Sequence, residues 1–377
     1  MVKSRQNQKL TFVFFSSLLT MNHSPHRLNY IGSKYQLLEW IESNILATTK
    51  WSSLQGKVIG DLFSGTGIVS YYFRTRGAIT VANDVEPYAE TITTALTLSV
   101  ASSQNLELIQ QLQREIEQGL QNSSRPGFIT ENYSPAGSAG RQFFTEQNAK
   151  KIDYLRHRIA VLRPTLTTQF DHDFLLASLL LAADRVANVP AVYGCYLKSF
   201  KKSALQPLTL HAPHTLTSPP SPESQTTRED STSSDLLAAL PYCDLVYLDP
   251  PYNERQYSKN YFPLNMIAQD PSEPFPTLKG KTGIPSTCFL SPLCQKANVA
   301  SAFERLVSGL HAEWIVISYN SESLLNKEQM TTLLSKYGHL TIIEQPYKRF
   351  KSFEYNEDKQ ICEYLYFLNK SFRPVNF

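Results

Sequence analysis

Cysteine is scarce in this chain of 377 residues, which has five cysteines and no Cys-x-x-Cys pair. An odd count without such pairs favours neither a disulfide framework nor a zinc site, so we expect no metal. No apolar run reaches the about 18 residues that a membrane-spanning helix requires. These absences predict a globular, cytoplasmic protein with no membrane partner.

An excess of charge of one sign is also lacking. Lys and Arg number 36 against 33 Asp and Glu, which gives a net charge of +3, and charged residues make up only 18% of the chain. A histone-like basic protein and an acidic disordered tail are therefore excluded. Any contact with nucleic acid has to come from a local cluster of cations.

The first 20 residues have a basic start followed by an apolar run at 10–19, as a signal peptide does. No small-x-small cleavage site follows this run. We therefore interpret residues 1–20 as a disordered or spurious N-terminal extension. All motifs with chemical meaning lie downstream of Met21.

A strand, a helix and a second strand follow one another early in the chain. Residues 58–63 read as a buried strand, 68–76 as a helix and 79–84 as the next strand. Two parallel strands need such a crossover connection, which is right-handed in nearly all proteins. The pattern predicts an α/β fold with a mostly parallel, Rossmann-like sheet.

Helical spacing of apolar residues then dominates from residue 88 to 190. Within it, 174–189 is an almost continuous apolar helix, in which we expect Asp184 and Arg185 to form a buried structural pair. Residues 211–234 contain four Pro, six Ser and five Thr, which predicts a flexible loop. Strands resume at 244–248, 314–318 and 362–368. The sheet is thus divided by a helical insertion, into a first half at 21–99, the insertion at 100–240 and a second half at 241–377.

The turn after the first strand, Asp61-Leu62-Phe63-Ser64-Gly65-Thr66-Gly67, is a candidate cofactor site. Glycines let the backbone approach a nucleoside closely, and Asp84 ends the second strand, where a carboxylate can bind ribose hydroxyls. A third glycine is missing, and a carboxylate at Asp61 would repel a pyrophosphate but attract an ammonium group. The turn therefore favours S-adenosylmethionine over a dinucleotide, the alternative being a tight turn that serves packing only.

A second motif, Asp249-Pro250-Pro251-Tyr252, directly follows the strand at 244–248. The carboxylate of Asp249 and the carbonyl of Pro250 are two acceptors that can converge on one amino group. Tyr252 adds a flat face on which a planar base can stack. By itself the motif could be an ordinary turn at the end of a strand, but downstream of the glycine turn it predicts binding of an exocyclic amine on an aromatic ring.

Three blocks in this order resemble the adenine-specific DNA methyltransferases of the Dam type, including those paired with restriction endonucleases. The blocks are 29–38 (NYIGSKYQLL), 61–67 and 249–257, the last extended to Tyr261. The resemblance implies a Rossmann-like methyltransferase sheet with an inserted, mainly helical target-recognition lobe at 100–240. It also implies S-adenosylmethionine as cofactor, double-stranded DNA as substrate and a functional pairing with a restriction endonuclease. We expect a monomer.

The resemblance assigns roles to individual residues. Tyr30 and Lys34 would help to bind the cofactor, with Lys34 near its carboxylate, whereas Lys34 taken alone reads as a solvated lysine after a turn. Asp61 would face the cofactor ammonium and Asp84 the ribose. The cofactor would be walled by Phe63, Gly65 and Gly67, and Asp249 would lie beside it. The catalytic residues that would bind the target base are Asp249, Pro250 and Tyr252.

Cations near aromatic residues are candidate DNA contacts, although charge clusters are more often solvated surface. They are Lys198, Lys201 and Lys202, then Arg255 and Lys259, then Lys348, Arg349 and Lys351. The same two acceptors would serve any exocyclic amine, so methylation of RNA or of the cytosine 4-amino group is an alternative. A DNA-binding subunit that retains the cofactor fold without activity is another.

Overall fold

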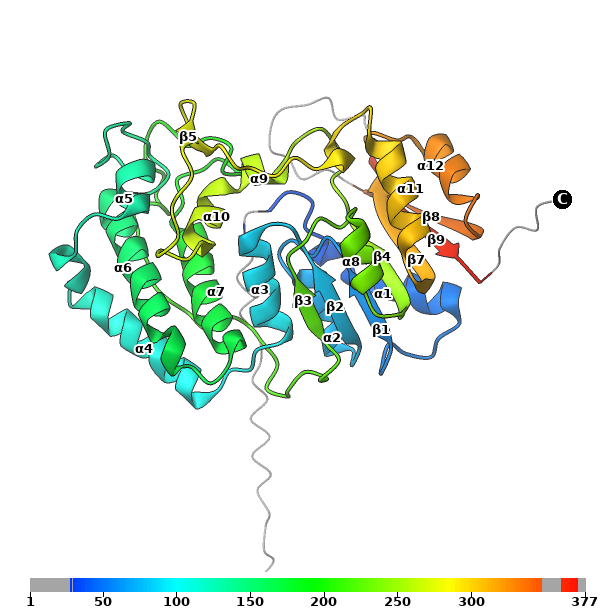
Figure 1. Ribbon diagram of the computed structural model, residues 1–377, viewed down its shortest axis with the longest axis horizontal. Coiled ribbons are helices and arrows are strands. Elements are labelled where there is room, and N and C mark those ends of the chain that lie inside the picture. Colours follow the sequence, from blue (N-terminus) through cyan, green and yellow to red (C-terminus); the bar gives the residue numbers. More distant parts are fainter. Residues whose placement is uncertain (1–27, 29, 348–360, 372–377) are drawn as a thin grey trace, which may run out of the picture.

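The structure is a computed structural model that describes residue 28 and residues 30–347 and 361–371. Figure 1 shows a helical lobe on the left and a twisted sheet with flanking helices on the right. In the described part, seven strands form the main sheet in the order β3-β2-β1-β4-β7-β9-β8. They are β1 (Val58–Asp61), β2 (Ile79–Asn83), β3 (Gln225–Thr227), β4 (Cys243–Leu248), β7 (Ala312–Asn320), β8 (His339–Tyr347) and β9 (Ile361–Asn369).

The sheet is mostly parallel, as the sequence predicts. β1 pairs in parallel with β2 and β4, and β4 pairs in parallel with β7. Only the pairs that involve β9 are antiparallel among those described in this sheet. The helices outside the lobe are α1 (Leu38–Thr49), α2 (Ile68–Thr75), α3 (Pro87–Thr97), α8 (Ser234–Ala239), α9 (Tyr257–Asn260), α10 (Phe262–Ala268), α11 (Val299–Gly309) and α12 (Lys327–Leu334).

Both faces of the sheet are buried, because successive side chains of a strand point to opposite faces. Leu245 and Tyr247 of β4 pack in the core that α1 and α2 cover. Val246 and Leu248, the alternate residues, pack in the core formed with α11 and α12. Burial on both sides explains why β4 reads as a continuous apolar run rather than an alternating one.

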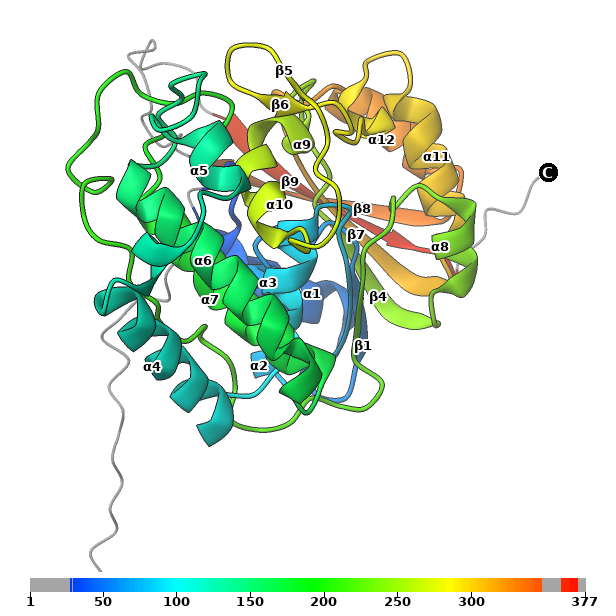
Figure 2. The same cartoon turned by 60° about the vertical axis from the view of Figure 1, so that its left-hand side comes forward.

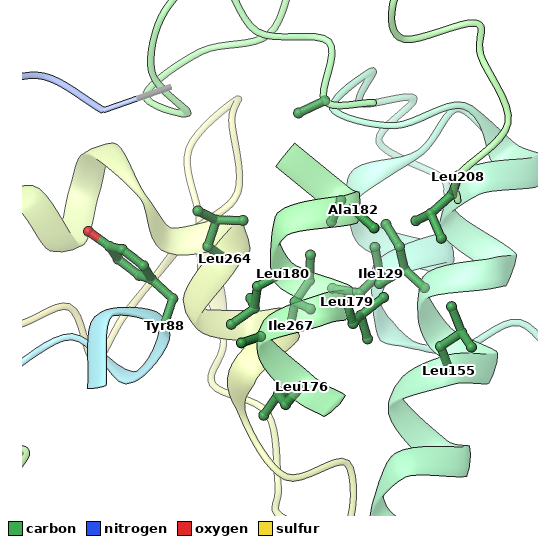
Figure 3. Packing of buried hydrophobic residues seen from close by; sticks show 14 of the residues in the cluster. Tyr88, Ile129, Leu155, Leu176, Leu179, Leu180, Ala182, Leu208, Leu264 and Ile267 are labelled. Carbon is green, nitrogen blue, oxygen red and sulfur yellow. The ribbon is translucent and has the colours of Figure 1, made fainter. Parts of the chain in front are cut away.

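The predicted helical insertion consists of α4 (Ser103–Glu117), α5 (Phe128–Tyr133), α6 (Glu146–Leu162) and α7 (Gln169–Arg185). Figure 2 shows α6 and α7 side by side. Helix α7 is the buried centre of this lobe, and Figure 3 shows Leu179 and Leu180 between α10 and the other lobe helices. The core is continuous with the sheet domain, since Tyr88 of α3 and Ile267 of α10 belong to the same cluster.

The prediction of a buried Asp184–Arg185 pair is wrong for one partner. Asp184 is buried and its Oδ1 accepts a hydrogen bond of 2.8 Å from the hydroxyl of Tyr193. Arg185 is exposed at the last turn of α7. Consecutive helix residues point about 100° apart, so one of the two can face the core while the other faces solvent.

The prediction of an unstructured loop at 211–234 is wrong for residues 225–227. These residues form β3, which pairs in parallel with β2 at the edge of the sheet. Side chains elsewhere bind the same segment: Arg74 Nη2 donates to the carbonyl of Ser218 at 2.7 Å, and Asn83 Nδ2 donates to that of Glu229 at 2.9 Å. The segment therefore belongs to the sheet domain rather than to the helical lobe.

The predictions for residues 1–20 and for Lys348, Arg349 and Lys351 lie outside the described residues, as does Asn29 of the first block. Across the described ranges, no helix is both long enough and apolar enough to cross a membrane. Nor do three or more His, Cys, Asp or Glu side chains in these ranges form a group that could hold a metal ion.

The glycine turn allows a stability prediction. Gly67 has φ of +72°, and a Cβ there would lie 2.9 Å from the Thr93 Cα of α3. Gly140 also has a positive φ, +57°, but a Cβ there would meet nothing within 4 Å. We expect Gly140→Ala to cost about 1–2 kcal/mol for the backbone conformation, and Gly67→Ala about 1–3 kcal/mol more because α3 must shift. Chemical denaturation of both variants measures the difference, and equal losses would contradict the close packing of the turn.

Candidate active site

The predicted site residues gather at one edge of the sheet. β2, β1 and β4 are neighbours, and each is followed at its carboxyl end by part of a motif: Asp84 after β2, the glycine turn after β1 and Asp249 after β4. Parallel strands bring their carboxyl ends to the same edge, where ligands of doubly wound sheets bind. The topology thus joins motifs that are far apart in the sequence.

An open cavity lies at this edge, and most of the predicted residues line it. They are Tyr30, Lys34, Phe63, Gly65, Asp84, Asp249, Pro250 and Tyr252. Two predicted cofactor residues, Asp61 and Gly67, are not on its wall. Asp61 lies buried beneath the turn, where its Oδ2 accepts a hydrogen bond of 2.6 Å from Ser70, and Gly67 packs against α3.

Asp249 and Tyr252 are linked within their own turn. The Tyr252 hydroxyl donates a hydrogen bond of 2.6 Å to Asp249 Oδ1 and lies 3.3 Å from Ser318 Oγ on β7. The Tyr252 ring also packs edge-on against Tyr319, at 5.4 Å between centroids. Two strands therefore fix the orientation of the ring and of the carboxylate before any ligand binds.

Lys34 is the cation of this site and is not the solvated lysine that its local sequence suggests. Its side chain is 4% exposed, and its ammonium lies 3.0 Å from Asp249 Oδ1. The same ammonium lies 4.7 Å from the centre of the Tyr252 ring, over its face. The first and third blocks of the resemblance are thereby in direct contact, through the ion pair of Lys34 with Asp249.

Asp84 organises the glycine turn from the neighbouring strand. Its carboxylate accepts hydrogen bonds from the amide of Gly65 at 2.8 Å and from the amide of Glu86 at 3.0 Å. Tyr30 closes the other side, because a Cβ on Gly65 would lie 2.8 Å from its hydroxyl. Glycine at position 65 therefore permits a contact between turn and tyrosine that any side chain would block.

Glu86 was not identified from the sequence, and Tyr261 was named only as the end of the third block, without a role. Glu86 is 4% exposed, and its carboxylate accepts hydrogen bonds from Ser258 of α9 and from Asn265 of α10, the latter at 2.5 Å. Tyr261 stacks on Tyr30 at 4.9 Å and binds the amide of Ile31 through its hydroxyl. Glu86 could have been predicted from its position two residues after Asp84, because both residues follow the carboxyl end of β2.

Carboxylates outnumber cations in and beneath the cavity. Burial raises the pKa of Asp61 to about 7, and the charges of Asp249 and Asp84 act in the same direction. Burial also raises the pKa of Asp84 to about 6 and that of Glu86 to about 7. A site with this field favours a positively charged ligand and disfavours a pyrophosphate.

The raised pKa values predict a pH-dependent stability. The folded-state pKa of Asp61 exceeds its ordinary 3.8, so the folded protein binds this proton more tightly than the unfolded chain. The stabilisation is complete below the ordinary pKa and is lost as the pH rises toward 7. We expect Asp61→Asn to raise the melting temperature relative to wild type, by an amount that grows from pH 5 to pH 8. The control for loss of a carboxylate is Asp244→Asn, which lies at the amino-terminal end of the neighbouring strand β4. A difference in melting temperature that stays constant from pH 5 to pH 8 would contradict burial of the Asp61 charge.

The predicted DNA contacts are only partly available. Lys201 is turned inward and donates a hydrogen bond of 2.9 Å to the carbonyl of Val189. Four of the other predicted cations are exposed: Lys198, Lys202, Arg255 and Lys259. Arg255 precedes α9 and Lys259 lies within it, and both are close in sequence to the turn at 249–252.

A doubly wound sheet with these two motifs at its carboxyl edge defines a Rossmann-like methyltransferase. The family model of the D12 class N6 adenine-specific DNA methyltransferases matches residues 30–333. The chain belongs to this family, as the resemblance predicted.

Curated relatives agree with the family. The Type II methyltransferase M.CviAII of Paramecium bursaria Chlorella virus 1 is 36% identical over 91% of this chain and 98% of the relative. M.NlaIII of Neisseria lactamica is 36% identical over 92% of this chain and 100% of the relative. M.FokI of Planomicrobium okeanokoites is 32% identical over 93% of this chain but only 54% of its own length.

Proposed function

We propose that this protein methylates the 6-amino nitrogen of a specific adenine in double-stranded DNA, as the modification enzyme of a restriction system. Membership of the adenine-specific family supports the reaction, and relatives named as Type II methyltransferases support the restriction context. The observation that carries the proposal is the contact of Asp249 and Tyr252, on the wall of the cavity that the glycine turn also lines.

The residues present fit S-adenosylmethionine as the cofactor. Asp61 Oδ1 is buried beneath the glycine turn and has no hydrogen-bond partner among the described residues, so its charge acts on the adjoining cavity, whose wall it does not reach, and would attract a cationic ligand there. Asp84 would bind the ribose, and Tyr30, Phe63 and Gly65 would wall the cofactor. When bound, this cofactor supplies an electrophilic methyl group on a sulfonium. A cationic donor is favoured by the excess of carboxylates around the cavity.

Asp249 has one oxygen to spare for the target base. Its Oδ1 is shared by the Tyr252 hydroxyl and the Lys34 ammonium, and no described residue donates a hydrogen bond to Oδ2. Oδ2 and the Pro250 carbonyl would accept the two N–H groups of an adenine 6-amino nitrogen. These bonds favour a pyramidal nitrogen and stabilise the positive charge that develops as it attacks the methyl group.

The adenine must leave the duplex to reach these acceptors, because its amino group is paired and stacked there. One face of the Tyr252 ring would receive the extruded base, and the Lys34 ammonium lies over the same ring, 4.7 Å from its centre. We assign target recognition to the helical lobe, α4 to α7, together with the adjoining segment to residue 210.

A methyl-transfer assay with labelled cofactor tests this function. We expect label to enter duplex DNA at adenine N6, and mapping of genomic DNA from expressing cells should show one short methylated sequence. Labelling of RNA or of cytosine N4 would move the protein to the alternative substrate classes. Binding of DNA without label transfer by the wild-type chain would favour an inactive DNA-binding subunit.

A further inference from the structure

A small hairpin after the catalytic turn is fixed to the helical lobe by buried contacts. Its strands, β5 (Leu278–Lys279) and β6 (Ile284–Pro285), have two residues each and pair antiparallel. A hairpin this short is not stable in water without support. Its conformation must therefore come from the contacts that the rest of the molecule makes with it.

Arg141 makes the main contact with the tip of the hairpin. Its side chain is 9% exposed, and its guanidinium donates hydrogen bonds to the carbonyls of Lys281 at 3.1 Å and Gly280 at 3.4 Å. A third bond, at 3.0 Å, goes to the carbonyl of Asn132 in the lobe. Gly283 makes room for this, since a Cβ there would lie 2.7 Å from the guanidinium carbon.

Further contacts fix the two sides of the hairpin. The Tyr133 hydroxyl of α5 donates a hydrogen bond of 3.0 Å to the carbonyl of Gly283. On the approaching segment, Phe275 stacks on Phe128 of α5 at 3.9 Å between centroids, and Arg156 of α6 covers Phe275 with its guanidinium. The hairpin is thereby a rigid extension of the lobe, although it lies between α10 and α11 in the chain.

The side chains at the tip are free cations. Lys279 and Lys281 are exposed, and neither pairs with a carboxylate within the described ranges. By contrast, Lys327 and Lys336 on α12 and just after it pair with Glu344 and Glu304. In both views the hairpin projects from the same side of the molecule as α9, which follows the catalytic turn (Figures 1 and 2).

We propose that the β5–β6 hairpin is a preformed contact for phosphates of the duplex beside the target site. This inference rests on the proposed function, since it assigns an element to the DNA substrate. A rigid backbone lowers the cost of ordering on binding, and two unpaired ammonium groups at its tip can replace counterions of the DNA. The function of the buried Arg141 would then be to hold the tip of the hairpin in the position that contacts the phosphates.

The test compares two double variants that each lose two positive charges. DNA affinity is measured by fluorescence anisotropy on one duplex that contains the methylated sequence, over a range of salt concentrations. For Lys279→Ala with Lys281→Ala, we expect weaker binding and a salt slope smaller by about 1–2, because about 0.9 counterions are released per phosphate contact. Lys327→Ala with Lys336→Ala should leave both quantities at the wild-type value. The rate at saturating DNA should be unchanged in both.

The hairpin assignment would be overturned if the hairpin variant kept the wild-type salt slope, or if both variants changed equally. The proposed function would still stand in that case, provided that the wild-type protein methylates the duplex. Absence of duplex binding by the wild-type protein would overturn both.

A single variant, Arg141→Lys, separates the position of the hairpin tip from its charge. It retains the cation but replaces the planar fork, whose Nε, Nη1 and Nη2 each donate to a different carbonyl, by a single ammonium nitrogen on a shorter side chain. We expect weaker DNA binding with the wild-type salt slope, and wild-type affinity would contradict a need for a fixed tip.

Discussion

Replacing Asp249 by alanine is expected to lower the methyl-transfer rate by at least about 100-fold, the usual cost of removing a positioned electrostatic group. The carboxylate is one of two acceptors proposed for the adenine amino group. Its loss also releases the Tyr252 hydroxyl and leaves the Lys34 ammonium, which is 4% exposed, without its carboxylate. Single-turnover assays with saturating DNA and cofactor measure the rate of the chemical step.

Loss of folding has to be separated from loss of chemistry. Removing one partner of a buried ion pair is destabilising, so thermal melting accompanies each assay. Asp249→Asn keeps the volume of the side chain but replaces one acceptor oxygen by a donor, and its rate should fall as well. Asp244→Ala, which removes the ion pair with Lys57 at the start of the same strand, is the control for stability alone. A folded Asp249→Ala protein that retains more than about one-tenth of the rate would exclude Asp249 as an acceptor.

Replacing Tyr252 by alanine is expected to weaken binding of target DNA by about 1–3 kcal/mol, the contribution of one base stacked on an aromatic ring. With 2-aminopurine as the target base, extrusion from the duplex should raise its fluorescence, and stacking on the Tyr252 ring should quench part of that rise. The alanine variant should therefore bind less tightly and give a brighter bound state.

Tyr252→Phe divides the two functions of the side chain. It keeps the ring for stacking and removes the hydroxyl that donates to Asp249 at 2.6 Å. We expect the phenylalanine variant to quench 2-aminopurine as the wild type does, while its rate falls because the carboxylate is less well oriented. Equal affinity and fluorescence in the alanine variant and the wild type would mean that the ring does not touch the base.

Short-range patterns were sufficient for β1, β2, β4, β7 and β9 and for the two motifs, but they did not predict β3 or β8. Residues 58–84 specify a strand, a positive-φ glycine turn and a helix by local propensity, and the prolines after Asp249 end β4 at a definite residue. The family could be predicted because each of the three blocks is a short continuous stretch, which can be recognised in the sequence without knowledge of the fold. Eight of the ten predicted site residues line one cavity. Six of them follow the carboxyl ends of β1, β2 and β4, which parallel pairing brings to one edge, whereas Tyr30 and Lys34 come from the segment before α1.

Composition misled at residues 211–234, where Pro, Ser and Thr suggested a flexible loop. β3 exists there because the backbone of β2 offers an unpaired edge and because Arg74 and Asn83 bind the carbonyls of the same segment. These partners come from α2 and β2, and local propensity carries no information about them. An edge strand of three residues gains its stability from pairing rather than from its own side chains.

The sequence by itself determined the fold class, the family and the identity of the two motifs, since these depend on residues close together in the chain. Only the tertiary structure placed Lys34 against Asp249, buried Asp61 beneath the turn and bound Glu86 to Ser258 and Asn265. The same holds for Arg141 and the hairpin tip. Each of these contacts joins polar groups from distant segments, and a buried polar group selects its partner by geometry that exists only after the chain has folded.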